Sequence, residues 1–543
     1  MFRIIATILF MSLLSVSCQG KEPPAGGTDT PVYSKGDQTY TPASVRKVLD
    51  RQQKAAFNYF YEGAEPQSGM ALEGNNRGNT ITIGGSGFGA MAIVVGVERG
   101  WISREEGVSR IRKMIDFLKS ADRYQGVWSH WHNPDGSYVA FGDQKACGDI
   151  VETSYMIEGL IVAKEFFDSS SETETALRND IDELYDSVDW KAYTGNGGDA
   201  LYWLWYSLED RYSLKVAGWN ECFVTYLLAL GANEEHAISP DIYEKGWNAP
   251  AFPDRKVNGY TLPLGKNEKG GPLFFSHYSF LGFDPRLMQD SKAWYWQQVV
   301  SHTMINRHYC LYEAPAENGY RNGVWGLTAC YGAGSTSGYS ARNPKNDDGV
   351  MAPTAALSSY PYTPFYSTQV LLELDKIELC QGQFGFADSY KPSENASNRN
   401  HLAIDQGPIV VMMENYRSGL IWKLFMRNEN VRKALERAGI GEPSFKQGFP
   451  FVVADSKTGI VDLMAHPDRE LYELQFYSEK AGKASFKIML GSTMDEVQVH
   501  EMDVESGLST FSFDDKNITR GKKYYISMTL PDGRTYQIET ILH

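Results

Sequence analysis

The chain has 543 residues, 42% of them hydrophobic and 13% aromatic, and a formal net charge of −15 at pH 7. A chain of this length and apolar content can form roughly two to four domains with well-filled cores. The surplus of carboxylates argues against a nucleic-acid partner and disfavours polyanionic substrates, because both need a positive protein surface. A neutral polymer is compatible with this charge. The 32 Tyr and 12 Trp residues suit a surface on which flat ligands stack, although an aromatic-rich helical core would also account for them.

The N-terminus has the pattern of a bacterial lipoprotein signal. Residues 1–18 start with a cationic group and continue in an apolar run over 4–16 that is too short to span a bilayer comfortably. The run ends in Leu-Ser-Val-Ser-Cys, which places Cys18 where the cysteine of a lipobox takes its lipid. An ordinary cleaved signal with a chance cysteine is the alternative. We expect a cell-envelope protein anchored in a membrane through Cys18, on the periplasmic or cell-surface side of the outer membrane.

Residues 19–41 are rich in Gly, Pro and Thr and cannot bury enough apolar surface to fold, so they are expected to form a flexible tether.

Neither the remaining cysteines nor the histidines predict a metal site. The other five cysteines are widely spaced and odd in number, which favours small buried hydrophobic residues, with one disulfide pair possible. They are Cys147, Cys222, Cys310, Cys330 and Cys380. His130 and His132 stand two residues apart, but no further ligands follow at a suitable spacing. We therefore expect no metal and no other cofactor.

Apolar residues recur at helical spacing throughout residues 42–442, which predicts an all-α domain. The predicted helices cover 45–61, 89–97, 104–118, 151–167, 172–188, 220–230, 294–306, 367–373 and 407–424. Long connections rich in Gly, Pro and Asn lie between them at 69–87, 246–272, 313–353 and 382–401, and loops of this length usually carry function. Helices that alternate with such loops predict an α/α toroid around a cleft. A helical solenoid is the alternative, but no repeat of fixed period is present.

The pattern changes near Pro443 to short alternating runs separated by turns. These runs cover 451–453, 459–464, 471–478, 484–490, 510–513, 524–529 and 535–541. They predict an immunoglobulin- or fibronectin-like β-sandwich over residues 443–543. We expect this domain to be a packing or spacer module without chemistry of its own, with carbohydrate binding as the alternative.

Several carboxylates stand where a loop enters an apolar helix. Asp149 and Glu152 are three residues apart and so share one helix face, although Asp149 could simply cap the helix. Glu221 follows Trp219 and precedes Phe223, so partial burial would raise its pKa and keep it protonated as an acid. A first-turn glutamate beside an Asn cap is an equally good local interpretation.

Asp405 also precedes an apolar helix and could be no more than its N-cap. The polar loop at 400–406 would favour an ionised carboxylate there, as a general base requires. Rings and imidazoles in or near the same junctions are candidate substrate contacts. They are Trp128, His130, Trp131, Trp219, His277, Tyr278, Trp325 and Tyr366.

Four long motifs occur in order along the helical part of the chain. They are GGPLFFSHYSFLGFDPR at 270–286, WGLTAC at 325–330, DDGVMAPTAALSSYPYTP at 347–364 and AIDQGPIVVMMENYRSGLIW at 403–422. These motifs resemble the glycoamylase-like family of bacterial hydrolases and, within it, the endo-β-1,2-glucanases of glycoside hydrolase family 144. The likeness covers about residues 43–440 and leaves out the predicted sandwich. It implies an (α/α)6 toroid, no metal requirement, and hydrolysis of β-1,2-glucan with inversion.

The resemblance also implies roles for the acids. The family motif that matches GDIVET carries functional acids, which correspond to Asp149 and Glu152; the acid of the WNE motif corresponds to Glu221 and that of IDQGP to Asp405. We expect Glu221 to be the general acid and Asp405 the base of an inverting glycoside hydrolase, with the other two acids binding sugar hydroxyls, tuning the acid or exchanging roles with Asp405. A surface glycan-binding lipoprotein without catalysis, or a related toroid hydrolase acting on another glucan such as an α-glucan, are the alternatives.

The lipid anchor gives the first testable prediction. Cys18→Ala should give a soluble or mislocalised protein, because a single thiol holds the lipid. Partitioning into detergent, with the wild type in parallel, measures this, and unchanged partitioning of the variant would refute the lipobox.

Overall fold

The computed structural model describes residues 43–140, 145–195, 197–247, 255–321, 323–443, 460–466, 471–478, 480–514, 516–519, 522–533 and 535–542. Cys18, the predicted tether and the predicted strand at 451–453 lie outside these residues.

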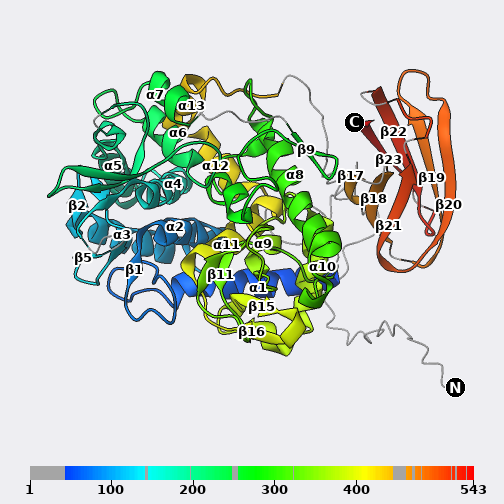
Figure 1. Ribbon diagram of the computed structural model, residues 1–543, viewed down its shortest axis with the longest axis horizontal. Helices are drawn as coiled ribbons and strands as arrows, with labels where there is room; N and C mark the ends of the chain where they lie inside the picture. Colours follow the sequence, from blue (N-terminus) through cyan, green and yellow to red (C-terminus); the bar gives the residue numbers. More distant parts are fainter. Residues whose placement is uncertain are drawn as a thin grey trace.

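Helices buried on all sides alternate along the chain with more exposed helices (Figure 1). A helix that is apolar all round belongs inside a fold, whereas a helix with one apolar stripe covers it. The inner helices are α2 (Ile83–Glu98), α4 (Ile150–Phe166), α6 (Phe223–Gly231), α9 (Pro353–Leu357) and α11 (Ala403–Arg417). The other helices are α1 (Ala43–Tyr61), α3 (Arg104–Ser120), α5 (Glu172–Asp186), α7 (Pro240–Gly246), α8 (Tyr295–His308), α10 (Pro364–Asp375), α12 (Leu420–Arg427) and α13 (Glu429–Arg437). Of these, α8 is an exception to the pattern, because it too is buried along nearly its whole length.

The first and last inner helices are neighbours. Helix α2 packs against both α4 and α11, while α4 also packs on α6 and α11 on α9. This inner layer, with other helices outside it, is consistent with an α/α toroid.

Two glycines allow α2 and α4 to touch through their backbones. A Cβ at Gly87 would lie 2.0 Å from the carbonyl oxygen of Tyr155, and a Cβ at Gly159 would lie 2.0 Å from that of Gly87. No side chain fits at either position, so glycine is required for this close approach. The contact brings the N-terminal turns of the two helices together.

The predicted helices are all present, with different bounds. The predicted helix at 89–97 begins at Ile83, because the glycine-rich segment before it is buried and helical. The predicted helix at 407–424 is divided by Gly419, which has a φ of +66°, into α11 and α12. The short helices α7, α9 and α13 were not predicted from the sequence.

Small antiparallel hairpins and bridges occupy much of the long connections. Their strands are β1 (Ile81–Thr82), β2 (Arg123–Tyr124), β3 (Val127–Trp128), β4 (Trp131–His132), β5 (Tyr138–Val139), β6 (Gly148–Asp149), β7 (Tyr202–Tyr206), β8 (Arg211–Lys215), β9 (Arg255–Val257), β10 (Tyr260–Leu262), β11 (Ala329–Tyr331), β12 (Tyr339–Ala341), β13 (Gln381–Gly382), β14 (Gly385–Phe386), β15 (Ser389–Lys391) and β16 (Ala396–Asn398).

The C-terminal strands lie to one side of the helices (Figure 1). They are β17 (Ile460–His466), β18 (Leu471–Ser478), β19 (Gly482–Leu490), β20 (Glu496–Val504), β21 (Gly507–Asp514), β22 (Lys522–Thr529) and β23 (Thr535–Leu542). They form an antiparallel three-stranded sheet, β17-β18-β21, and an antiparallel four-stranded sheet, β20-β19-β22-β23. One apolar core takes side chains from both sheets, and the rings of Phe486 and Phe511 stack across it at 4.0 Å. The largely polar β20 was missed from the sequence.

The prediction that Tyr366 contacts substrate is wrong, because Tyr366 contacts the C-terminal strands instead. It lies on α10, is 3% exposed, and donates its hydroxyl to Glu473 Oε1 on β18 at 2.8 Å. The guanidinium of Arg307 lies 3.7 Å from the centre of its ring. The ring has no free face for a sugar, so Tyr366 joins the helical part to the strands.

The five cysteines are buried and no disulfide joins any two of them, as expected for small core residues. Among the described helices, none combines the length and apolarity that a membrane crossing requires.

The second prediction concerns the C-terminal part. A chain ending at residue 441 should keep its helical content and its catalytic turnover, because the helical and strand cores are separate clusters and every candidate acid lies before that residue. Far-UV circular dichroism and turnover measure this. Tyr366→Phe in the full chain is the matched control, since it removes only the hydrogen bond to Glu473. A truncated chain that is folded but inactive would contradict the prediction.

Candidate active site

Asp149 caps α4 and at the same time holds two side chains. Its Oδ1 accepts the backbone N–H groups of Val151 and Glu152 at 3.1 and 2.9 Å. Its Oδ2 lies 2.7 Å from His130 Nδ1 and accepts the indole N–H of Trp203 at 3.0 Å. The N-cap interpretation is therefore correct for Oδ1. The other oxygen, Oδ2, positions the imidazole of His130.

Glu152 and Asp149 flank His130. Glu152 Oε2 accepts the backbone N–H of Gly84, in the first turn of α2, at 2.8 Å, and its Oε1 lies 4.0 Å from His130 Nε2. Burial by itself would lower the pKa of His130, but the carboxylates of Glu152 and Asp149 raise it to about 9. Burial raises the pKa of Glu152 to about 7, against the opposing effect of the imidazolium. The three residues thus form a buried cluster around one cation.

Glu221 lies in the turn before α6 and is half-buried. Its backbone carbonyl accepts the hydroxyls of Tyr155 at 3.2 Å and Ser279 at 2.6 Å, which hold the turn in place. Burial raises the pKa of its carboxyl to about 7. A carboxyl in this range is partly protonated at neutral pH, as a general acid must be.

Behind this turn lies an aromatic cluster. Trp219 is 5% exposed and packs against Trp247, Phe280 and Tyr295 at ring separations of 5.9 to 6.5 Å. Trp219 and Phe223, the apolar residues that flank Glu221 in the sequence, both belong to this buried aromatic cluster. A contact of Trp219 with substrate stays a prediction.

The surroundings of Asp405 differ from those that the sequence predicted. It lies inside the first turn of α11, is 2% exposed, and its carboxyl is hydrogen-bonded to that of Asp388. Burial and the neighbouring carboxyl raise its pKa well above the ordinary value. The expectation that a polar loop keeps Asp405 ionised is therefore wrong, because the residue belongs to the helix and faces a second acid.

Tyr278 is within electrostatic range of three of the predicted acids. Its ring packs against Phe88, Tyr155 and Phe274. Burial raises the pKa of its phenol, and Asp405, Glu221 and Glu152 raise it further. The four predicted acids, His130 and Tyr278 are thus brought into one cluster. Trp131 lies at its edge, half-buried and with its ring 4.9 Å from that of His130.

Three predicted substrate contacts are corrected by burial. Trp128 is fully buried and donates its indole N–H to the Leu118 carbonyl at 2.9 Å, and Trp325 is also fully buried. His277 is 1% exposed and shares a hydrogen bond with the Ser359 hydroxyl at 2.9 Å. Burial lowers the pKa of His277 to about 3, so it is a neutral core residue.

Several residues near the acids were not predicted. Glu73, in the loop before α2, is within electrostatic range of His130, Glu152 and Asp405. Trp203, Asp388 and Tyr339 also belong to connections. Nothing in the local pattern of these segments distinguished them, apart from the unusual length of the loops that hold Glu73, Asp388 and Tyr339.

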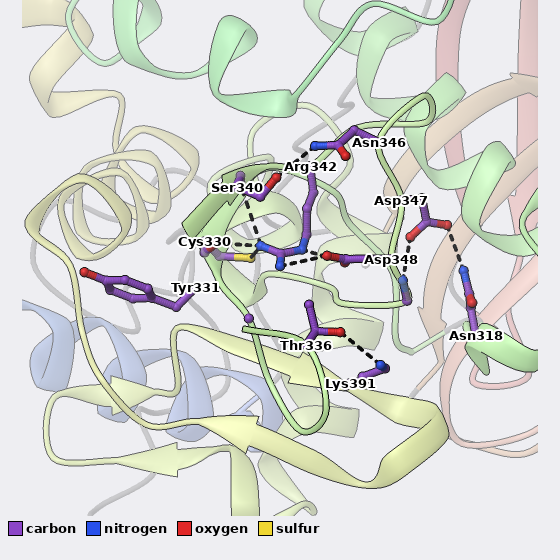
Figure 2. A network of polar contacts seen from close by, with 12 residues as sticks. Asn318, Cys330, Tyr331, Thr336, Ser340, Arg342, Asn346, Asp347, Asp348 and Lys391 are labelled. Atoms are coloured by element: carbon purple, nitrogen blue, oxygen red, sulfur yellow. Dashed lines mark hydrogen bonds and ion pairs between the residues drawn. The ribbon is translucent and has the colours of Figure 1, made fainter. Parts of the chain in front are cut away.

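A buried arginine next to the β11–β12 hairpin holds it in place (Figure 2). The guanidinium of Arg342, which is fully buried, donates to both carboxylate oxygens of Asp348 at 2.7 and 3.0 Å and to the carbonyl of Cys330 at 2.6 Å. At the turn of the hairpin, Lys391 donates to the hydroxyl of Thr336 at 2.9 Å. This bracing positions Tyr339, which is 50% exposed and within electrostatic range of Asp405 and Glu73.

In the described part of the chain, no three His, Cys, Asp or Glu side chains are arranged to hold a metal ion.

Residues 213–429 match the Glycoamylase family model, described as "putative glucoamylase". The exo-β-1,2-glucooligosaccharide sophorohydrolase of Parabacteroides distasonis is 38% identical over 428 residues, which cover 74% of this chain and 58% of that protein. The chain thus accounts for little more than half the length of this curated relative.

Two solved structures are also similar. The endo-β-1,2-glucanase of Chitinophaga pinensis, in complex with sophorotriose and glucose, is 42% identical, with a TM-score of 0.69 over 74% of this chain and all of that one. A Bacteroides uniformis protein described in the same words as the family model is 42% identical, with a TM-score of 0.70 over 74% of this chain and 99% of that one. The chain belongs to the glycoamylase-like family of bacterial glycoside hydrolases.

The third prediction concerns the charge on His130. An NMR titration of the histidine rings should place its pKa near 9, and Asp149→Asn should lower this value, because the variant removes a carboxylate and a hydrogen bond to the imidazolium. His277 is the internal control, since it has no carboxylate partner among its hydrogen bonds and should stay neutral down to about pH 3. Titration of His130 at or below the ordinary value near 6.5 would contradict the cluster.

Proposed function

We propose that this protein hydrolyses a neutral β-glucan, with β-1,2-linked glucan as substrate, endo attack and inversion at the anomeric carbon. The observation that carries the proposal is Glu221, a half-buried carboxyl with a pKa raised to about 7 that shares a cluster with further acids around Tyr278. The similarity to the Chitinophaga pinensis endo-β-1,2-glucanase supports the substrate and the mode of attack.

In the proposed reaction the protonated Glu221 gives its proton to the glycosidic oxygen as the bond to the anomeric carbon breaks. A water attacks the opposite face of that carbon and loses a proton to a base, for which Asp405 is the candidate. Asp149 and Glu152, held around His130, bind sugar hydroxyls or tune the acid, and either could exchange roles with Asp405. Because Glu221 must be protonated, the rate should fall as the pH rises through about 7.

A second candidate function is exo attack with release of the disaccharide sophorose. The similarity to the Parabacteroides distasonis sophorohydrolase favours it. The early products on linear β-1,2-glucan separate the two: endo attack gives a range of oligosaccharides, and exo attack gives the disaccharide alone.

We also propose the finer points of architecture and location. The alternation of inner and outer helices supports an (α/α)6 toroid, and the core shared by two antiparallel sheets supports an immunoglobulin- or fibronectin-like sandwich. The lipobox at Cys18 supports a lipid anchor that holds the enzyme at the cell envelope.

The fourth prediction tests the acid. Glu221→Gln should lower turnover by roughly a hundredfold or more with little change in folding, because the amide cannot donate the proton that the leaving oxygen needs. Reducing-end release from β-1,2-glucan measures the rate, and early NMR or polarimetry should show the inverted anomer.

Glu158→Gln is the matched control. Glu158 is a fully buried carboxyl on α4 with a pKa raised by burial, and it accepts the backbone N–H of Gly282 at 2.9 Å. Its loss should leave turnover unchanged. A wild-type rate in Glu221→Gln would refute Glu221 as the general acid. Products with retained anomeric configuration would refute the inverting mechanism.

A further inference from the structure

We propose that Asp388 and Asp405 form a dyad that holds one proton between them, and that Asp388 acts as the positioning residue that sets the charge on Asp405. The shared proton is argued from the contacts of the two carboxyls alone. The use of the dyad as the proton acceptor in hydrolysis rests in addition on the proposed function.

The first argument is that the hydrogen bond between the two carboxyls requires a proton. Asp388 and Asp405 are each 2% exposed, and their side chains are hydrogen-bonded to each other. Asp388 Oδ1 and Asp405 Oδ2 are buried, and neither oxygen finds a hydrogen-bond donor among the described residues. Two ionised carboxylates would repel each other and could not form this bond, whereas a single shared proton satisfies both oxygens.

The surroundings decide where the charge lies. Asp388 Oδ2 accepts the backbone N–H of Tyr331 at 2.6 Å, and the positive charge of Arg342 acts on the same carboxylate. Figure 2 shows Arg342 held in this region by Asp348 and Cys330. Burial raises the pKa of Asp388 to about 6, and both features act against this rise, so they favour the ionised form of Asp388 at neutral pH.

Asp405 has the opposite surroundings. Burial raises its pKa, and the neighbouring carboxyls of Asp388 and Glu73 raise it further. The other titratable groups that interact with the two acids are neutral at neutral pH: they are Tyr59, Tyr278, Tyr339 and Cys330. The resting dyad therefore carries one negative charge, placed mainly on Asp388, and its proton lies mainly on Asp405.

This arrangement gives a balanced route for the proton of the attacking water. As the water oxygen bonds to the anomeric carbon, its proton passes to Asp405, and the proton already on Asp405 passes to Asp388. The glycosidic oxygen receives its proton from Glu221 and leaves as a hydroxyl. The dyad ends neutral and Glu221 ends as a carboxylate, and one proton moves from the dyad through solvent to Glu221 to restore the resting state.

The dyad is tested by infrared spectroscopy of the full chain, which detects the carbonyl stretch of a protonated carboxyl. The measurement is made at about pH 8.5, where Glu152 and Glu221 are mostly ionised because their pKa values are about 7. Carbon-13 labelling of the aspartate carboxyl identifies the aspartate band. We expect one such band from the wild type, and we expect Asp388→Asn and Asp405→Asn each to abolish it. The new amide donates to the remaining carboxyl, which then ionises.

Glu158→Gln is again the matched control, because it removes a buried carboxyl whose pKa burial also raises and should leave the labelled aspartate band unchanged. A band that survives in Asp388→Asn would overturn the dyad, since Asp405 would then hold its proton by burial alone. Absence of the band from the wild type would also overturn it. If Asp388→Asn does not fold, Asp405→Asn carries the test, and a persisting aspartate band in that variant refutes the shared proton.

Kinetics test the role in hydrolysis separately. Asp388→Asn should lower kcat on β-1,2-glucan by roughly tenfold with little change in KM, because Asp405 becomes a permanently ionised and weaker base. If Asp388→Asn loses the band but keeps its kcat, the dyad is supported and its role in the reaction is refuted. A protein with the band but without activity on any β-glucan would refute the proposed function and leave the dyad intact.

Discussion

The site depends on the contact between the backbones of α2 and α4. Gly87 and Gly159 leave no room for a side chain between these helices, so their first turns lie side by side. Only then can the N–H of Gly84 reach Glu152, which lies on the other helix. The backbone of His130 is held on the same turn, because its carbonyl accepts the N–H of Ile83 at 3.2 Å. A larger residue at either glycine would have to separate the helices and, with them, the acids.

With the acids held this close, charge becomes the second constraint. Several carboxyls share a buried region with one imidazolium, so they cannot all be ionised. The structure resolves this by giving each acid different partners. Asp149 has partners on both oxygens, Glu152 lies near the His130 imidazole, Glu221 is partly buried, and Asp405 has a second carboxyl beside it. A carboxyl that is partly protonated near neutral pH, such as Glu221, beside a second carboxyl is what acid–base cleavage of a glycoside needs.

The C-terminal strands have a hydrophobic core of their own. Their core is separate from that of the helices, and the similar solved structures match about three quarters of the chain. The link between the two parts includes the buried contact of Tyr366 with Glu473 and Arg307. Tyr366, which the sequence suggested as a sugar-stacking ring, thus connects the helical part to the C-terminal strands.

The sequence alone determined the helical class, the change to strands near Pro443 and the helix junctions where Asp149, Glu152 and Glu221 stand, because these depend on local periodicity and on residues adjacent in the chain. Tertiary structure alone decided which rings face the acids: Trp128 and Trp325 look like Trp131 in sequence, yet they are fully buried. It also decided the charge on Asp405, because its partner Asp388 comes from a different connection and neither local pattern nor spacing indicates that the two meet. Proton affinity is set by neighbours in space, and those neighbours are fixed only when the helices pack.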